Sequence, residues 1–299
     1  MTKTTNTHQL PLAITEFGAG TGRPALILHG GGGPGTVAPI AGHLAQQRHL
    51  HTLVPVHPGW DGTPRPDWCD GVDDLALAYL HLLQDRGLWD VLVVGSSLGG
   101  WIGAEMAVRD LGGIISGLVL IDAAGIAVEE APIPDFFSFD ARQVAEHSFH
   151  DSDRFYTDPA LLPPEQLALR AANMATMRTI AGDPYMHDPK LRRRLGRVTL
   201  PTMLLWGESD RVFSPAYGAA YADAFGGETR FEVIPEAGHL PQIEQPEATF
   251  ALIDAYLTGT RRGPRTDPRT SPRTDARTGP HMARSSAPKS YNAKSSTGR

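Results

Sequence analysis

A tight turn between a buried strand and a helix is the strongest constraint in this sequence. Residues 91–94 read Val-Leu-Val-Val, a short apolar run typical of a strand that is buried on both faces. Residues 95–99, Gly-Ser-Ser-Leu-Gly, follow directly. A Gly-x-Ser-x-Gly turn needs its glycines because a side chain at either end would strike the neighbouring strand or helix. The turn therefore predicts that Ser97 presents its hydroxyl at the end of the strand.

Apolar runs and amphipathic stretches alternate along the first 258 residues. Seven runs predict strands, at 12–17, 25–28, 52–56, 90–94, 117–122, 202–206 and 230–234. Five amphipathic stretches predict helices, at 37–47, 73–86, 98–109, 215–225 and 246–257. Strand alternating with helix predicts an α/β fold in which helices cover both faces of a mostly parallel sheet.

The alternation stops between residues 125 and 197. This stretch is rich in proline and then shows an Ala, Leu and Met pattern over 165–180 that predicts a helix. We expect a helical insertion at 125–197 that lies over the C-terminal edge of the sheet, and a core formed by residues 1–124 and 198–258. The aromatic and Met side chains of the insertion either pack it onto the core or line a substrate pocket.

The composition changes abruptly after residue 258. Pro-Arg-Thr recurs at 264–266, 268–270 and 272–274, and Ser, Ala, Lys and Gly dominate the rest. Such a segment has too little apolar surface to bury a core, so residues 259–299 are predicted to be a disordered basic tail. The whole chain has a net charge of -6, so the folded part carries an acidic excess. An acidic body is not expected to bind nucleic acid.

The bulk features predict a soluble protein. The polar N-terminus does not resemble a secretory signal, and the most continuous apolar stretch, 113–128, is interrupted by Asp122 and too short to span a bilayer. The single cysteine, Cys69, has no partner for an internal disulfide, which fits a reducing cytoplasm. We expect a cytoplasmic protein with no membrane partner, and the sequence leaves its oligomeric state open.

Two further residues of the right chemistry follow predicted strands. A serine hydroxyl is a poor nucleophile unless an imidazole takes its proton and a carboxylate orients that imidazole. Asp210 comes shortly after the strand at 202–206, and His239 shortly after the strand at 230–234. The carboxyl ends of parallel strands meet at one edge of a sheet, so we expect Ser97, Asp210 and His239 to lie together.

With these motifs in the order Ser, Asp, His, residues 10–258 resemble the α/β-hydrolase fold family. The resemblance implies that Ser97 is the nucleophile, that His239 acts as general base and then acid, and that Asp210 orients His239. It also implies that the insertion is a helical cap.

A developing oxyanion needs two backbone N–H donors held in advance. One is expected to be Leu98, directly after the nucleophile. The other is expected from residues 29–35, His-Gly-Gly-Gly-Gly-Pro-Gly, which resemble the His-Gly-rich oxyanion loop of the family. We favour Gly31 as that donor, with Gly32 as its rival.

Each role has an alternative candidate. Ser96 neighbours Ser97, but its place in the turn points it away from the base. Asp122 ends another predicted strand and is the rival for the orienting acid. His29 is more readily interpreted as a structural part of its loop than as a base.

Two histidine pairs were weighed as metal ligands. His49 and His51 would share one face of a strand, and His147 and His150 one face of a helix. Neither pair has converging Asp, Glu or Cys partners, so no metal site is predicted. No glycine-rich nucleotide loop stands in the right context, so no cofactor is expected.

Serine at the turn argues against the branches of the family that attack with a carboxylate. We expect hydrolysis of a small, largely apolar carboxylic ester or lactone through an acyl-enzyme on Ser97. The residues expected to contact this substrate are Gly32, Trp101, Phe136, Phe137 and Met174.

Two other functions stay open. The loop at 29–35 also resembles that of C–C bond hydrolases of ring-cleavage products, which usually have Asn where Ser96 stands and Trp where Ile243 stands. A slow-turnover ligand receptor on the same fold is the alternative from a different class.

Overall fold

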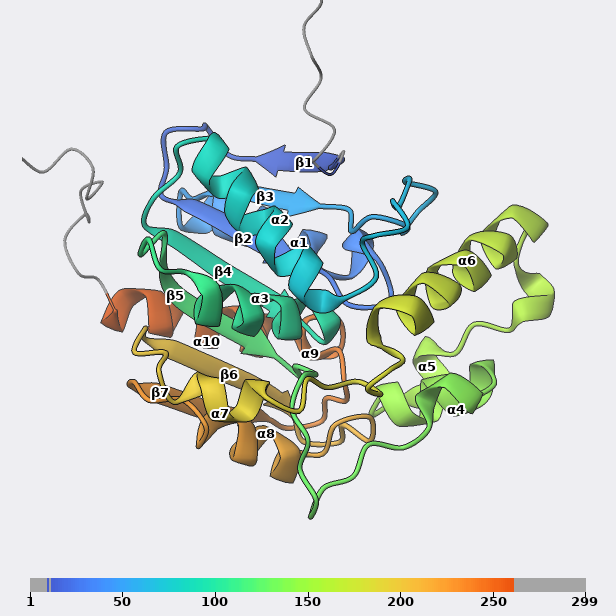
Figure 1. Ribbon diagram of the computed structural model, residues 1–299. Helices are drawn as coiled ribbons and strands as arrows, with labels where there is room; N and C mark the ends of the chain where they lie inside the picture. The colour runs from blue at the N-terminus through green and yellow to red at the C-terminus, as the bar shows by residue number, and fades with distance from the viewer. Residues whose placement is uncertain (1–9, 11, 261–299) are drawn as a thin grey trace, which may run out of the picture. The chain divides into compact units, whose positions relative to one another are not determined.

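The computed structural model describes residues 10 and 12–260, in which seven strands form one sheet (Figure 1). The strand order is β1-β3-β2-β4-β5-β6-β7. The edge strand β1 pairs antiparallel with β3, and every other neighbouring pair is parallel. The strands are β1 (Ile14–Phe17), β2 (Pro24–Leu28), β3 (His51–Pro55), β4 (Val91–Ser96), β5 (Ile115–Ile121), β6 (Thr202–Gly207) and β7 (Thr229–Ile234). The predicted α/β fold with a mostly parallel sheet is confirmed.

The side chains of β4 show why helices cover both faces of the sheet. Val91 and Val93 belong to one hydrophobic cluster, and Leu92 and Val94 belong to a second one on the opposite face. The first cluster takes in side chains of α2, α3 and α8, and the second takes in side chains of α1 and α10. The helices are α1 (Ala38–Gln47), α2 (Val72–Asp85), α3 (Leu98–Arg109), α8 (Pro215–Ala222), α9 (Pro241–Glu244) and α10 (Pro246–Gly259).

Some element ends differ from the prediction. β4 continues two residues beyond Val94, because Gly95 and Ser96 still pair in register with β5. Helix α8 ends at Ala222 rather than at residue 225. Helix α10 includes Gly259, which had been assigned to the tail, and residues 261–299 of the predicted tail lie outside the described residues. None of the described helices is both long and apolar enough to cross a membrane.

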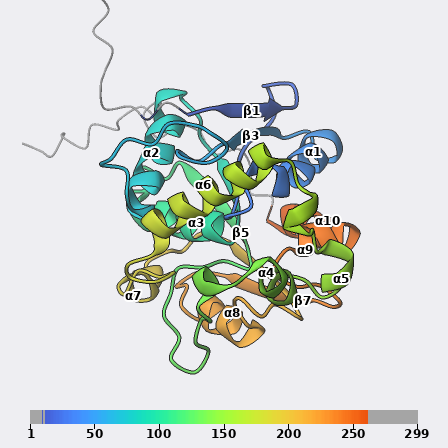
Figure 2. The same cartoon turned by 90° about the vertical axis from the view of Figure 1, so that its right-hand side faces the viewer.

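The chain between β5 and β6, residues 122–201, is an inserted segment with helices of its own. Figure 2 shows α4, α5 and α6 facing the viewer at the edge where the parallel strands end. The predicted helix at 165–180 is present as α6, but the shorter helices were not predicted. The elements are the 3-10 turns η2 (Phe136–Ser138) and η3 (Pro159–Leu161) and the helices α4 (Ala141–Ser148), α5 (Ser152–Phe155), α6 (Pro164–Ala181) and α7 (Leu191–Leu195).

Helix α6 is fastened to the loop that follows β3. The Asn173 side chain accepts a hydrogen bond from the Asp61 backbone N–H at 2.9 Å and donates one to the Asp61 carboxylate at 3.0 Å. One turn further along, the Thr176 hydroxyl donates to the Gly59 carbonyl at 3.1 Å. These bonds hold the C-terminal half of α6 against the core.

The end of α4 is fastened on the other side of the sheet edge. The Glu244 carboxylate accepts hydrogen bonds from the backbone N–H groups of His150 and Asp151, and also from that of Gly238. The His239 backbone N–H donates to the Ser148 carbonyl at 2.8 Å. The loop that carries His239 is thus bonded directly to the inserted segment.

Candidate active site

Ser97 lies on a strained turn between β4 and α3. Its φ of 55° is in the left-handed region, which non-glycine residues rarely adopt. A Cβ on Gly95 would collide with the Gly99 carbonyl, and one on Gly99 would collide with the Leu28 carbonyl of β2. The glycines therefore allow β4, α3 and β2 to pack closely around the serine, as the sequence predicted.

An unbroken chain of hydrogen bonds links the three predicted residues. The distance from Ser97 Oγ to His239 Nε2 is 2.9 Å, and the distance from His239 Nδ1 to Asp210 Oδ2 is also 2.9 Å. All three side chains are buried, with relative exposures of 5%, 7% and 3% for Ser97, His239 and Asp210. The Asp210 carboxylate can only accept a hydrogen bond, so the proton of a neutral His239 lies on Nδ1. His239 Nε2 is then free to accept a hydrogen bond from the Ser97 hydroxyl.

Asp210 is fixed by its own loop after β6. Its Oδ1 accepts hydrogen bonds from the backbone N–H groups of Val212 and Phe213 at 2.7 and 3.0 Å. The Trp206 indole N–H closes the same loop by donating to the Phe213 carbonyl at 2.7 Å. Oδ2 is therefore the oxygen that remains for His239.

Asp122, the rival acid, is also buried at this edge. Its Oδ1 accepts from the Gly207 backbone N–H at 2.9 Å, whereas Oδ2 has no hydrogen-bond partner among the described residues. Desolvation, followed by the charge of Asp210, raises the pKa of the Asp122 carboxyl well above its usual range. His239 directs its hydrogen bond to Asp210, so the geometry favours Asp210 as the orienting acid.

The remaining alternatives take other positions. The Ser96 hydroxyl accepts a hydrogen bond from Gln242 at 3.2 Å and is fully buried. His49 precedes β3 with a φ of 57° and so does not share a strand face with His51. His150 lies beyond the end of α4 and bonds to Ser209, so it does not share a helix face with His147. The expected face sharing of both histidine pairs is therefore wrong.

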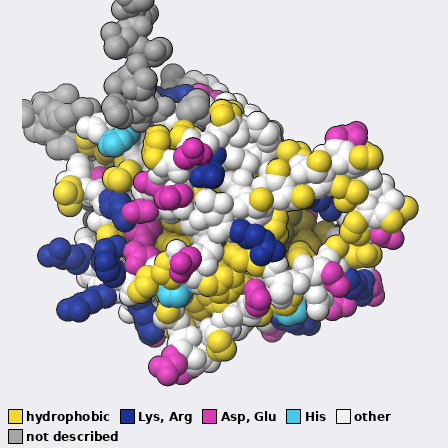
Figure 3. Space-filling view, turned by 45° about the vertical axis from the view of Figure 1, so that its right-hand side comes forward, with side chains coloured by type: hydrophobic (Ala, Val, Ile, Leu, Met, Phe, Trp, Pro, Cys, Tyr) yellow, Lys and Arg dark blue, Asp and Glu magenta, His cyan; other side chains and the backbone are white. Residues whose placement is uncertain are grey.

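Ser97 and His239 open onto a cavity of about 650 Å³ between the core and the inserted segment. Figure 3 shows the hollow on this face, with hydrophobic side chains along it. Its size suits a small molecule, and its lining is largely apolar. The lining residues outside the hydrogen-bond chain are Gly30, Gly31, Gly32, Thr36, Phe136, Phe139, Ala141, Val144, Ala145, Ser148, Phe149, Phe155, Thr157, Pro159, Leu167, Arg170, Ala171, Asn173, Met174, Met177, Met186, Val212, Phe213 and Leu240.

The cavity includes only part of the predicted substrate set. Gly32, Phe136 and Met174 line it, and Trp101 and Phe137 do not. Trp101 is buried in the core cluster, where α3 packs against the chain after β5. Phe137 packs on the Tyr185 ring with centroids 5.3 Å apart, under the Arg178 guanidinium.

Several lining residues were not predicted from the sequence. Val212, Phe213 and Leu240 directly follow the acid and histidine motifs, so their position in the chain was a usable signal. Arg170 gave no such signal. It is an exposed residue that lines the cavity, and no described carboxylate forms an ion pair with it.

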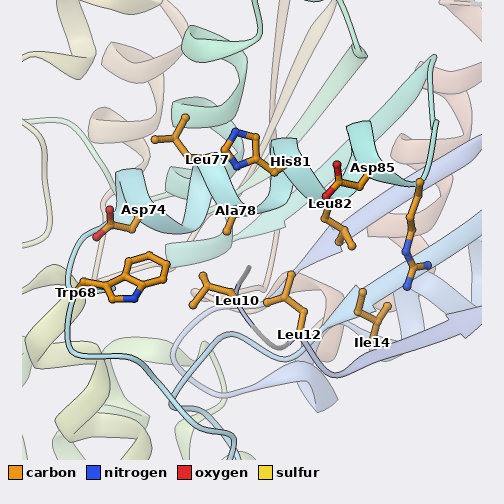
Figure 4. Close-up of a pocket in the computed structure, with 11 residues that line it drawn as sticks. Leu10, Leu12, Ile14, Trp68, Asp74, Leu77, Ala78, His81, Leu82 and Asp85 are labelled. Carbon is orange, nitrogen blue, oxygen red and sulfur yellow. The ribbon is translucent and has the colours of Figure 1, made fainter. Parts of the chain in front are cut away.

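A second cavity, of about 410 Å³, lies away from Ser97. It lies beside α2, and Figure 4 shows Leu77, His81 and Leu82 on its α2 side. Leu10, Leu12 and Ile14 form the opposite wall. None of the candidate catalytic residues lines it.

A mostly parallel sheet with a Ser-His-Asp hydrogen-bond chain at the carboxyl ends of its strands defines a class of α/β enzymes that attack with serine. Comparison with family models identifies the family. The alpha/beta hydrolase family matches residues 25–252, and the chain belongs to it.

The proteins to which this chain is similar are named for more than one activity. The chain is 28% identical over 248 residues, 77% of its length, to a 2-hydroxy-6-oxo-6-(2'-aminophenyl)hexa-2,4-dienoic acid hydrolase from Metapseudomonas resinovorans, of which it covers 82%. Among solved structures, a bacterial membrane phospholipase A matches with a TM-score of 0.70 at 23% identity, over 84% of each chain. An esterase from Thermogutta terrifontis matches with a TM-score of 0.62 at 23% identity, over 84% of this chain and 94% of the esterase. These structural matches support the fold.

Proposed function

We propose that this protein is a serine hydrolase that cleaves a small carboxylic ester or lactone with a largely apolar acyl group. The observation that carries the proposal is the hydrogen-bond chain from Ser97 Oγ through His239 to Asp210 beside an apolar cavity. Esterases among the matched structures are consistent with this activity. The inserted segment then acts as the cap over the substrate, and the reaction needs no cofactor.

In the first half of the reaction the acyl group moves to the enzyme. Ser97 Oγ attacks the carbonyl carbon as its proton moves to His239 Nε2, and Asp210 stabilises the imidazolium. The Leu98 and Gly31 backbone N–H groups bind the oxyanion of the tetrahedral intermediate. The alkoxide leaving group then takes the proton from His239, and an ester on Ser97 remains.

Water completes the second half. His239 Nε2 takes a proton from a water molecule as its oxygen attacks the acyl-enzyme carbonyl. Collapse of this second tetrahedral intermediate breaks the bond to Ser97 Oγ, which recovers its proton from His239. The products are a carboxylic acid and an alcohol, or one hydroxy acid from a lactone.

The test is covalent labelling followed by kinetics. A fluorophosphonate probe should label the wild type at Ser97, located by mass spectrometry, and Ser97→Ala should abolish both the label and the hydrolysis of short p-nitrophenyl esters. Ser96→Ala is the matched control, because that neighbouring hydroxyl bonds to Gln242 and should leave labelling unchanged. Equal ester hydrolysis by wild type and Ser97→Ala would disprove the proposal.

A second candidate, C–C bond hydrolysis of a vinylogous diketone, is favoured by two observations. The Metapseudomonas resinovorans relative is named for a dienoic acid substrate, which carries a carboxylate. Arg170 supplies an unneutralised guanidinium to the same cavity, and a guanidinium is well suited to bind a carboxylate.

The two candidates differ in the bond that breaks. A panel should compare p-nitrophenyl butyrate, γ-butyrolactone and a 2-hydroxy-6-oxohexa-2,4-dienoate, each with wild type and Ser97→Ala. A kcat/KM for the dienoate that exceeds those for ester and lactone by tenfold or more would favour the second candidate. The opposite order would favour the first.

A further inference from the structure

Buried aromatic rings surround the glycine-rich loop that follows β2. His29, His57 and Trp60 are fully buried, and the His29 and His57 rings stack with centroids 3.7 Å apart. Trp60 meets both rings edge-on. The reaction steps above use none of these side chains, although Gly30 and Gly31 beside them line the cavity.

Each of these rings donates to a different carbonyl of the loop. His57 Nε2 donates to the His29 carbonyl at 2.8 Å, and His29 Nδ1 donates to the Gly30 carbonyl at 2.6 Å. Trp60 Nε1 donates to the Gly31 carbonyl at 3.1 Å. Three successive peptide groups are therefore fixed, two by side chains from the segment after β3 and one by the loop's own His29.

The protonation of both histidines follows from their partners. The His57 backbone N–H donates to His29 Nε2 at 3.0 Å, so the His29 proton is on Nδ1. His57 Nε2 donates, so its Nδ1 accepts from the Tyr79 hydroxyl at 2.5 Å. Burial favours these neutral forms, because it lowers the pKa of His29 to about 4 and the pKa of His57 well below its usual value.

Fixing a carbonyl also fixes the N–H on the other side of the same peptide. In a trans peptide the two groups point in opposite directions. The Gly30 carbonyl, which also accepts from the Gly33 N–H at 3.2 Å, therefore sets the direction of the Gly31 N–H. Neither the Gly31 nor the Gly32 N–H has an acceptor within the described part of the chain.

Contacts with Ser97 distinguish these two N–H groups. A Cβ on Gly30 would come within 2.9 Å of the Ser97 Cβ, so the peptide that joins Gly30 to Gly31 lies beside the nucleophile. A Cβ on Gly32 would meet no atom of Ser97 within 4 Å.

We propose that His29, His57 and Trp60 are positioning residues for the oxyanion hole. The His29 bond to the Gly30 carbonyl aims the Gly31 N–H at the oxyanion that forms on attack by Ser97. The His57 and Trp60 bonds fix the peptide groups on either side and so hold the Gly30–Gly31 peptide in place. Tyr79 holds His57 in the tautomer that this arrangement needs. This inference rests on the proposed function, because it concerns the same transition state.

Trp60→Phe is the sharpest test, because it keeps an aromatic ring at this buried position and removes the indole N–H, together with part of the ring volume. We expect kcat for a p-nitrophenyl ester to fall at least tenfold, with KM within twofold of wild type. Affinity for an alkylboronic acid, which forms a tetrahedral adduct with a serine, should fall by a similar factor. A merely structural role would not separate kcat and boronate affinity from KM in this way.

Trp89→Phe is the control for the lost ring volume, because Trp89 packs against the same hydrophobic cluster but precedes β4, at the end opposite to Ser97. It should keep wild-type kcat and boronate affinity. Tyr79→Phe is the second test variant and should lower kcat severalfold with the same signature, since it removes the hydroxyl that fixes the His57 tautomer.

The outcomes separate this inference from the proposed function. A folded Trp60→Phe with kcat and boronate affinity within twofold of wild type would overturn the inference. If Trp60→Phe does not fold, unchanged kinetics of Tyr79→Phe would overturn it instead. A wild type that neither hydrolyses esters nor labels at Ser97 would refute the proposed function itself.

Discussion

The carboxyl oxygens of Asp122 and Asp210 lie within 4.8 Å of each other, both buried, at the ends of adjacent strands β5 and β6. Two ionised carboxylates at this distance repel by about 3 kcal/mol even at an effective dielectric constant of about 20. The Asp210 carboxylate accepts three hydrogen bonds, two from backbone N–H groups of its loop and one from His239. The Asp122 carboxyl accepts one, from the Gly207 N–H. Burial and the neighbouring Asp210 charge therefore favour the protonated form of Asp122 by raising its pKa.

This division of roles predicts different effects of two matched substitutions. Asp210→Asn should lower kcat for ester hydrolysis by about 10³–10⁴, because an amide favours the wrong tautomer of His239. Asp122→Asn should change kcat less than about threefold, because an amide replaces a neutral acid of the same shape. Steady-state kinetics of the two variants checks this. A larger loss in Asp122→Asn than in Asp210→Asn would reverse the assignment.

The raised pKa of Asp122 also predicts a pH dependence of stability. An unfolded chain releases this proton at the ordinary carboxyl pKa, whereas the folded protein retains it to higher pH because of burial and the Asp210 charge. The contribution is complete below the unfolded pKa and is lost as pH rises toward the folded pKa. Asp122→Asn lacks this term, so its stability relative to wild type should rise as pH increases above the ordinary Asp pKa of about 3.9. Urea unfolding at several pH values measures the difference, and a constant difference would contradict the prediction.

The buried histidines beside the glycine-rich loop predict that the fold loses stability in acid. The folded pKa of His29 is about 4, so an unfolded chain binds a proton near pH 6.5 while the folded protein does not. This stabilisation is present above pH 6.5 and is lost as pH falls toward 4, and it amounts to about 3 kcal/mol. His29→Gln should flatten the fall in the free energy of unfolding over that range, measured by urea titration. The exposed His81 gives the matched control, and His81→Gln should keep the wild-type slope. Equal slopes for wild type and His29→Gln would contradict the prediction.

The sheet and the three central residues could be predicted because their signals are local. Apolar runs mark buried strands, and Ser97, Asp210 and His239 each follow such a run at the edge where parallel strands end. The choice between Asp210 and Asp122 needed the structure, since both residues follow strands. Backbone donors and the direction of His239 distinguish them.

The cavity and its supports depend on contacts between distant segments. Phe136 and Phe137 are neighbours in η2, but only Phe136 reaches the cavity. The contact of His57 with His29 joins the segments after β3 and β2, and no spacing in the sequence announces it. The short helices α4 and α5 were missed because segments of eight and four residues carry too little periodicity.

Two buried tyrosines on α8 predict opposite effects on stability. The Tyr217 hydroxyl accepts from the Ile126 N–H at 2.9 Å and donates to the Ile126 carbonyl at 2.8 Å, so it secures the start of the inserted segment. Tyr217→Phe leaves the Ile126 N–H and carbonyl buried without this partner, and it should lower the free energy of unfolding by about 1–3 kcal/mol. The Tyr221 hydroxyl has no hydrogen-bond partner among the described residues, so Tyr221→Phe should be neutral or stabilising. Denaturant unfolding compares them, and equal losses would contradict the assignment.

Arg170 predicts that the cavity distinguishes anionic from neutral substrates. Its guanidinium has no carboxylate partner within the described chain and lines the cavity from an exposed position, where solvent screening limits an ion pair to about 1 kcal/mol. Arg170→Gln should therefore raise KM roughly fivefold for a substrate with a terminal carboxylate, such as p-nitrophenyl hydrogen succinate. KM for neutral p-nitrophenyl butyrate should stay within twofold. Arg192→Gln, an exposed arginine on α7, is the control that should change neither value. Equal effects of Arg170→Gln on both substrates would show that Arg170 does not bind the carboxylate.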